Sequence, residues 1–126
     1  DGANWTNKNN WTGDLSRAAI NSPYNATKWQ GVTTEIVDGG KHITRIQLSN
    51  NKLSGVMPVS IGGLSKLEIL NLSSNKLSGN LPLEMSNLSS LKTVYFNNNE
   101  FSGKVPNFTG ATMLSAFYIS LDQLYL

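Results

Sequence analysis

Cysteine is absent from this chain of 126 residues, and histidine occurs only once. The lack of cysteine excludes a disulfide framework and thiolate metal ligands, and His42 is the single candidate for the base of a catalytic triad. His42 follows Lys41 in an alternating run, where an ordinary half-exposed strand residue is expected. Glu35 and Asp38 flank a turn and could share a cation, but a solvated turn is the simpler interpretation. We therefore predict that the protein is not an enzyme and has no catalytic residues, no cofactor and no metal site.

Charged residues and long apolar runs are scarce as well. The net charge is +2 and charged residues make up 14% of the chain, so neither nucleic acid nor an anionic membrane is expected as a partner. No apolar run approaches the roughly 18 residues that a membrane-spanning helix needs. We therefore expect no membrane insertion, and the chain length suits one domain.

The chain does contain a repeat of 24 residues that begins at Ile43. Each copy has an apolar-x-x-apolar-x-apolar run, then an Asn, then an apolar-Ser-Gly triplet and an apolar-Pro pair. A fixed period of this size is the signature of a solenoid, in which each copy buries its apolar face against its neighbours. The matching positions of the three full copies include Ile46/Leu70/Val94, Leu48/Leu72/Phe96, Asn51/Asn75/Asn99, Gly55/Gly79/Gly103 and Pro58/Pro82/Pro106.

Each recurring residue type has a structural explanation. The alternating run predicts a short strand with every second side chain inward, and stacked copies then form a parallel sheet on the concave side. Asn51, Asn75 and Asn99 are expected to form a ladder of hydrogen bonds to backbone groups of the turn after each strand. The glycines suit unusual backbone angles or a close approach of neighbouring copies. We therefore interpret the recurring residues as structural and not as binding residues.

The Leu-Ser-Gly-x-apolar-Pro pattern resembles leucine-rich repeats, in the 24-residue form typical of plant-type repeats. The resemblance implies an α/β-type solenoid, a short curved stack with a parallel β-sheet on its concave side. Residues 43–126 would hold three full copies and one partial copy, in which Leu114, Phe117 and Ile119 repeat the strand spacing after a shift of one residue. The last seven residues are largely apolar where a solenoid normally has a polar cap. We expect either a longer natural protein or self-association through this C-terminal end.

Residues 1–42 differ in character and are predicted to form an N-terminal cap. The segment around Asp14 predicts a short helix, and two alternating runs around Asp38-Gly39-Gly40 predict a β-hairpin that pairs with the outer edge of the first repeat strand. The pattern Asp-Gly-x-Asn-Trp, with a later Trp-x-Gly-Val-Thr, resembles the N-terminal unit of leucine-rich-repeat proteins from bacterial surfaces and from algae or protists. The plant-type cap has Cys where this chain has Thr33, which favours the bacterial relatives.

The outward positions of the strands are left free by the fold and form the candidate binding surface. Because strands lie about 4.8 Å apart, the outward residues of successive strands should form columns, one of which ends in two tyrosines. Tyrosine suits a contact surface, although two exposed tyrosines can also simply satisfy β-propensity. Thr44 belongs to the same outward set, and the predicted ligand-binding residues on the concave face are Arg45, Gln47, Glu68, Asn71, Lys92, Thr93, Tyr95 and Tyr118.

The function we expect is the non-catalytic recognition of a protein or peptide by a secreted or cell-surface module. One alternative is a glycan-binding or adhesion module, in which Tyr95 and Tyr118 would stack on sugar rings, and another is a structural spacer within a longer surface protein. Six Asn-x-Ser/Thr sequons would be glycan acceptors in a eukaryotic secreted protein, but such triplets also arise by chance in an Asn-rich chain, and we expect no glycosylation. They begin at Asn4, Asn10, Asn25, Asn71, Asn87 and Asn107.

Overall fold

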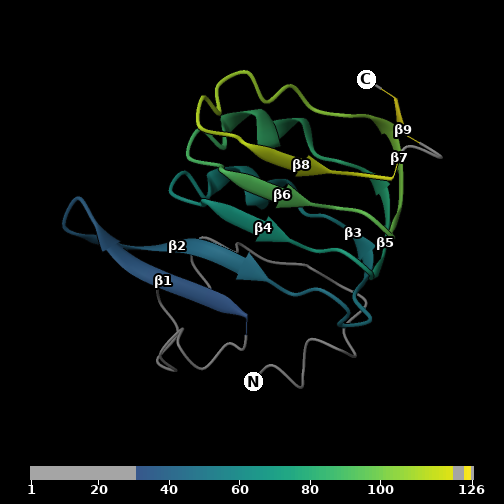
Figure 1. Cartoon of the computed structure of the whole chain (residues 1–126), viewed down its shortest axis with the longest axis horizontal. Helices are drawn as coiled ribbons and strands as arrows, with labels where there is room; N and C mark the ends of the chain where they lie inside the picture. Colours follow the sequence, from purple (N-terminus) through teal and green to yellow (C-terminus); the bar gives the residue numbers. More distant parts are fainter. Residues whose placement is uncertain (1–30, 121–123, 126) are drawn as a thin grey trace.

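The computed structural model of the protein describes residues 31–120 and the backbone of residues 124 and 125. These residues form successive turns of a solenoid that stack on one another (Figure 1). We call this stack of turns the coil. The helix predicted around Asp14 lies outside the described residues. Within the described residues there is no α-helix, so the coil is built from strands, short 3-10 helices and loops.

Five strands form the sheet along one side of the coil, in the order β1-β2-β4-β6-β8. Their bounds are β1 Val32–Val37, β2 Gly40–Gln47, β4 Ile69–Asn71, β6 Thr93–Tyr95 and β8 Ala116–Tyr118. The expected hairpin is present: β1 pairs antiparallel with β2, and every later pair is parallel. The hairpin therefore covers the outer edge of the first repeat strand. The predicted boundary between residues 42 and 43 falls inside β2, so the hairpin and the first repeat share one strand.

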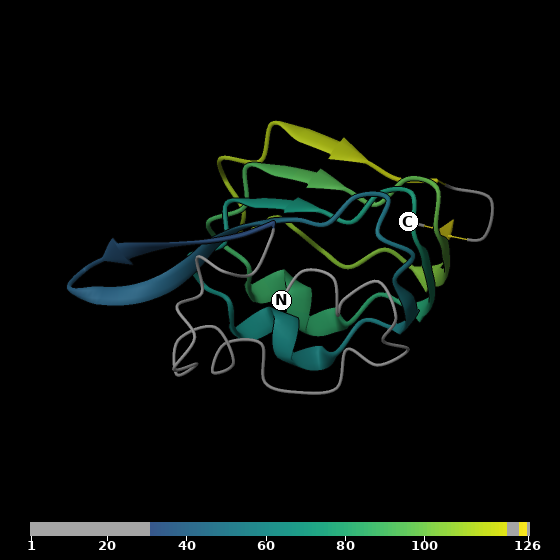
Figure 2. The same ribbon diagram turned by 90° about the horizontal axis from the view of Figure 1, so that it is seen from below.

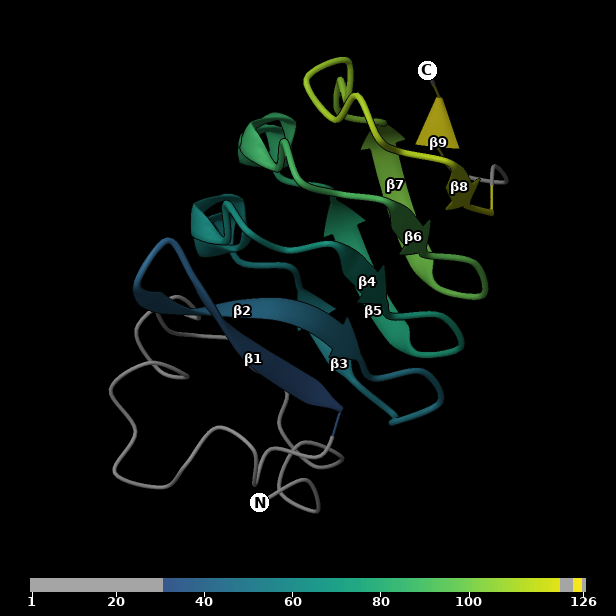
Figure 3. The same ribbon diagram turned by 60° about the vertical axis from the view of Figure 1, so that its left-hand side comes forward.

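A second sheet, which the apolar pattern of the sequence does not reveal, lies beside the first (Figure 3). Its strands follow the order β3-β5-β7-β9 and consist of β3 Ser54–Val56, β5 Lys76–Asn80, β7 Glu100–Lys104 and β9 Leu124–Tyr125. The glycines of the Ser-Gly pairs have positive φ angles, for example 76° at Gly79 and 82° at Gly103. Val56 lies over Gly79, and a Cβ there would stand 3.2 Å from the valine side chain. Glycine thus serves both the backbone angle and the close approach of the neighbouring repeat.

Two 3-10 helices lie on the opposite side of the coil from the five-stranded sheet (Figure 2). They are η3, Val59–Gly63, and η4, Leu83–Asn87, and the extended residues Pro58 and Pro82 immediately precede them. Proline is tolerated there because the first residues of a helix have no use for their N–H groups. η3 packs directly against η4, and a Cβ on Gly62 would overlap the carbonyl of Glu84.

The core lies between the sheets and the 3-10 helices and is built from the inward side chains of each copy. Val94 faces Phe117, so the fourth copy is shifted by one residue as its sequence spacing predicted. Phe117 and Ile119 are half-buried against the core, and Phe117 contacts the ring of Phe96 edge-on at 6.2 Å between centroids. The most deeply buried side chains are Leu53, Ile61, Leu67, Leu70, Leu72, Leu77, Met85, Leu88, Leu91, Val94 and Phe96.

The prediction that Thr44 lies on the open face is wrong, because Thr44 is only 2% exposed. In the hairpin register Thr33 pairs with Arg45 and Thr34 pairs with Ile43, so Thr44 is an extra residue without a partner on β1. Such a β-bulge interrupts the alternation of side chains. Both Ile43 and Thr44 are consequently buried, and Arg45 is the first outward residue of the repeat strand.

Candidate functional site

The strand register brings four of the predicted binding residues into one row. Gln47 pairs with Asn71, Asn71 with Tyr95, and Tyr95 with Tyr118. Their inward neighbours are buried, as Leu70 is, or half-buried against the core, as Phe117 is, so alternation turns the four side chains away from the core. We call Gln47, Asn71, Tyr95 and Tyr118 the outer row, and the side of the five-stranded sheet that carries it the outer face.

The two tyrosines at one end of the outer row stack on each other. Their ring centroids are 4.9 Å apart and the ring planes differ by 2°. This separation matches the distance between neighbouring strands, so each ring stands beside the other along the row. Tyr118 is 54% exposed and Tyr95 is half-buried. One face of each ring is therefore covered by the other ring, while ring edges and the second face of Tyr118 remain accessible.

A second row of outward residues runs beside the outer row. It begins with Arg45 and continues through Ile69 and Thr93 to Ala116. Arg45 is the one charged residue of this row and it is exposed. Near the tyrosines the row consists of the small side chains of Thr93 and Ala116, so the aromatic rings rise above their immediate neighbours.

The predicted residues Glu68 and Lys92 lie one position before this second row and form an ion pair between adjacent repeats. The Lys92 ammonium lies 3.2 Å from a Glu68 carboxylate oxygen. Because the two charges largely cancel, the surface around the tyrosines presents hydroxyl, amide and aromatic groups rather than net charge.

The predicted asparagine ladder does not share the outer face. Asn75 accepts hydrogen bonds at its Oδ1 from the backbone N–H groups of Asn51 and Leu53, at 2.9 and 3.0 Å. Its Nδ2 donates to the carbonyls of Leu48 and Leu72, both at 2.9 Å. Asn75 thereby connects two repeats through groups that are buried in the coil.

Asn99 repeats this arrangement one turn later. Its Oδ1 accepts from the Leu77 N–H at 3.1 Å, and its Nδ2 donates to the carbonyls of Leu72 and Phe96. Asn51 donates to the Ser49 carbonyl at 3.0 Å in an exposed position. The ladder side chains are therefore engaged with backbone groups of the turns, as predicted from the repeat.

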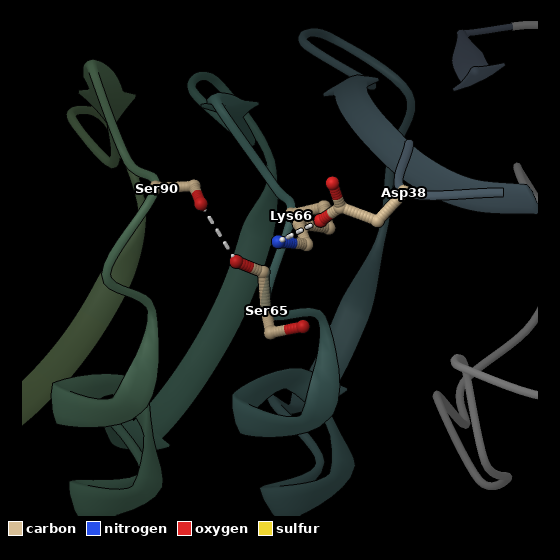
Figure 4. Close-up of polar contacts among 4 residues, drawn as sticks. All are labelled: Asp38, Ser65, Lys66 and Ser90. Carbon is tan, nitrogen blue, oxygen red and sulfur yellow. Dashed lines mark hydrogen bonds and ion pairs between the residues drawn. The ribbon is translucent and has the colours of Figure 1, made fainter. Parts of the chain in front are cut away.

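The cap hairpin is tied to the first repeat by an ion pair at its turn (Figure 4). The Lys66 ammonium lies 3.1 Å from a carboxylate oxygen of Asp38. One repeat further along, the Ser90 hydroxyl donates to the Ser65 carbonyl at 2.8 Å. The contacts drawn in Figure 4 therefore link neighbouring units of the coil. Asp38 is the residue of the hairpin turn that contacts the first repeat.

Other candidate groups give no second site in the described part of the chain. Residues 31–120, 124 and 125 contain no group of three His, Asp or Glu side chains able to hold a metal ion. Glu35 lies exposed on β1 opposite the half-buried His42. None of the helices formed by these residues has the length and apolarity needed to cross a membrane.

The stacked strands, the regular 3-10 helices and the asparagine ladder define a repeat solenoid whose open sheet is free for contacts. The sequence profile of the leucine-rich repeat family matches residues 26–77 and 41–101, which together span more than half of the chain. The protein belongs to the leucine-rich repeat family. A comparison with curated protein sequences finds no match.

Several solved structures resemble the chain, and ectodomains of Arabidopsis thaliana proteins are among them. The receptor kinase SOBIR1 of Arabidopsis thaliana shares 26% identity at a TM-score of 0.68, over 82% of this chain and 61% of its own. The BIR2 ectodomain of the same plant shares 27% identity at a TM-score of 0.70, over 89% of this chain and 62% of its own. The PEPR1–AtPEP1 structure shares 28% identity at a TM-score of 0.66, over 83% of this chain and 16% of that one. The chain thus spans about three-fifths of the SOBIR1 and BIR2 ectodomains.

Proposed function

We propose that this protein is a non-catalytic recognition module that binds a protein or peptide ligand on its outer face. The observation that carries the proposal is the outer row itself, which ends in two stacked tyrosines that the core does not require. Arg45, Glu68, Lys92 and Thr93 would border the contact. The similar BIR3 and PEPR1 structures, which are complexes with SERK2 and AtPEP1, support a ligand of this class.

The geometry of the tyrosine pair favours a peptide over a sugar. A sugar ring stacks on the open face of an aromatic ring, and because Tyr95 and Tyr118 cover one face of each other, only the second face of Tyr118 is left for such a contact. Their edges and hydroxyl groups instead suit hydrogen bonds and apolar contacts with a chain laid across the strands. Gln47 and Asn71 continue the row with amide groups that can pair with the backbone of an extended peptide.

We also propose an extracellular or cell-surface location, supported by the receptor ectodomains that the chain resembles. A relationship to bacterial or protist surface proteins rests on the cap pattern and on Thr33, and it stays a prediction, as does self-association through the C-terminal end. The location, the relationship to bacterial or protist proteins and self-association can each be wrong without affecting the proposal that the outer row binds a ligand.

Selection from a library of displayed random peptides tests the proposed site, and it does not require the natural ligand to be identified first. We expect the immobilised protein to enrich peptides whose binding is lost when both outer-row tyrosines are replaced, in Tyr95→Ala/Tyr118→Ala. The matched control is Leu83→Ala, which removes an exposed apolar side chain from η4 on the other side of the coil. A glycan array probed in parallel tests the alternative ligand class.

A photo-crosslinking residue placed at Gln47 or at Leu83 then locates the bound peptide. Crosslinking from position 47 alone is the expected result. Failure to enrich any peptide, equal crosslinking from both positions, or binding that survives the double replacement would each contradict the proposal, and a hit on the glycan array alone would replace it with the glycan alternative.

A further inference from the structure

Three of the six Asn-x-Ser/Thr triplets lie in the part of the chain that the structure describes. They begin at Asn71, Asn87 and Asn107. An Asn-linked glycan is bulky and hydrophilic, so it requires an exposed acceptor whose surroundings leave room for it. The three triplets differ strongly in the exposure of the asparagine and in the room around it. This difference distinguishes a triplet that can accept a glycan from one that occurs by chance.

Asn107 has the surroundings of an acceptor. It is exposed in the loop that joins β7 to β8, directly after Pro106. Its Oδ1 accepts a hydrogen bond from the Thr109 backbone N–H at 2.8 Å, and Thr109 is exposed as well. The third residue of the triplet is thus held next to the amide that would be modified.

The place of Asn107 in the repeat is the position at which η3 and η4 begin in the earlier copies, although no 3-10 helix follows Pro106. Pro106 and Asn107 correspond to Pro58-Val59 and Pro82-Leu83, the pairs that begin η3 and η4. Val59 and Leu83 are 64% and 68% exposed on the side opposite the five-stranded sheet. A glycan on Asn107 therefore projects from that side.

Asn71 has the opposite surroundings, although its triplet fits the same pattern. It is half-buried in β4, whose backbone pairs with β2 on one side and with β6 on the other. Its Oδ1 accepts hydrogen bonds from the backbone N–H and the hydroxyl of Ser73, at 3.1 and 2.7 Å, much as Asn107 accepts from Thr109, so burial and strand pairing are what separate the two triplets. A glycan at this position would cover the outer row beside Tyr95.

Asn87 is intermediate between these two. It is exposed at the end of η4, but the middle residue of its triplet, Leu88, is 1% exposed and belongs to the core. A transferase that binds the triplet as an extended segment must displace Leu88 from the core, whereas the middle residue of the Asn107 triplet, Phe108, is only half-buried.

We propose that Asn107 is a site of N-linked glycosylation and that Asn71 is not. The co-reactant is an oligosaccharide carried on a lipid diphosphate, transferred by an enzyme of a eukaryotic secretory pathway. The Asn107 amide nitrogen forms a bond to the anomeric carbon of the first sugar while the bond from that carbon to the diphosphate oxygen breaks. The amide gives up one proton to a base of the transferase, and the lipid diphosphate leaves. The glycan occupies the side of the coil away from the outer row.

The test is expression of the whole chain through the secretory pathway of insect cells, followed by enzymatic release of Asn-linked glycans and peptide mass spectrometry. Release converts each glycosylated Asn to Asp, so the occupancy of every triplet is measured separately. We expect most molecules to carry a glycan at Asn107, fewer at Asn87, and almost none at Asn71. Thr109→Ala keeps the asparagine and should abolish modification at Asn107, which is seen as a gel band that migrates faster by the mass of one glycan.

The proposal is overturned if the secreted protein is unmodified at Asn107, or if occupancy at Asn71 or Asn87 equals or exceeds that at Asn107. Asn71→Gln is the control, and it should leave the glycan content unchanged. Thr109 is exposed and outside the core, so retained secretion of Thr109→Ala shows that any loss of the glycan is not a folding defect. Each of these outcomes is independent of peptide binding by the outer row.

Discussion

Leu70 and Asn71 are neighbours on β4, yet their positions follow opposite rules from repeat to repeat. In the register of the five-stranded sheet, the partners of Leu70 are Ile46 on one side and Val94 on the other, and both are apolar and buried. The partners of Asn71 are Gln47 and Tyr95, which differ in size and polarity and are not required to be apolar. The repeat thus constrains the inward side of the sheet and leaves the outward side free to vary, which is where a ligand-binding surface can develop.

The largest expected effect comes from the inward side. Leu70→Ala should lower the free energy of unfolding by about 2–5 kcal/mol, because it removes a fully buried side chain and leaves a cavity. The neighbouring change Asn71→Ala should cost less than about 1 kcal/mol, since it removes only hydrogen bonds to Ser73 at the surface. Urea titration of the two variants measures the difference, and equal losses would show that the two sides of the sheet are not distinct.

The asparagine ladder is expected to give the next largest effect. Asn75→Ala leaves the N–H groups of Asn51 and Leu53 without their acceptor, and it should cost about 1–3 kcal/mol. Hydrogen exchange at these two amides should accelerate together, because a single side-chain oxygen protects both. A stability loss no larger than that of Asn71→Ala would mean that other groups satisfy the turn.

Removing the exposed tyrosine should have a smaller effect on stability. Tyr118→Ala loses the stacking contact with Tyr95, which is worth about 0.5–1.5 kcal/mol in aromatic pairs. Thermal unfolding followed by circular dichroism measures this cost. A loss as large as that of Leu70→Ala would assign Tyr118 to the core and remove the reason for placing a ligand there.

The smallest expected effect concerns the ion pair between the cap hairpin and the first repeat. Lys66→Ala should change stability by no more than about 1 kcal/mol, because Asp38 is well exposed and the pair is screened by solvent. The difference between this variant and the parent should shrink as salt is added. A large, salt-independent loss would show that Lys66 supports the hairpin by packing and not by charge.

The sequence predicts the inward-facing residues of the coil far better than the second sheet and the β-bulge in the hairpin. The period, the strands, the hairpin and the one-residue shift before Phe117 follow from apolar spacing, because burial acts on every copy alike. The second sheet is not predictable in this way, since Ser78-Gly79 is a strand only through its pairing with the neighbouring turns. Alternation misplaces Thr44 because a β-bulge breaks the strict pattern and leaves no mark in the apolar spacing.

The candidate site is predictable as a set of outward positions, but not in its detail. Alternation and the strand spacing place Gln47, Asn71, Tyr95 and Tyr118 in one row. The parallel stacking of the two tyrosines and the pairing of Glu68 with Lys92 depend on rotamers and on distances between repeats, which a sequence pattern does not contain.

In our interpretation, the inward side of the sheet is structural and the outward side binds a ligand. The most direct test is to select a peptide on the parent protein and to measure how tightly the Tyr95→Ala/Tyr118→Ala variant binds it. Isothermal titration should show a loss of about 30-fold or more, as expected when a contact worth about 2 kcal/mol is removed. Circular dichroism of the same sample should show a folded protein. An unchanged affinity, or a loss of binding that merely follows unfolding, would contradict the assignment of the outer row to ligand recognition.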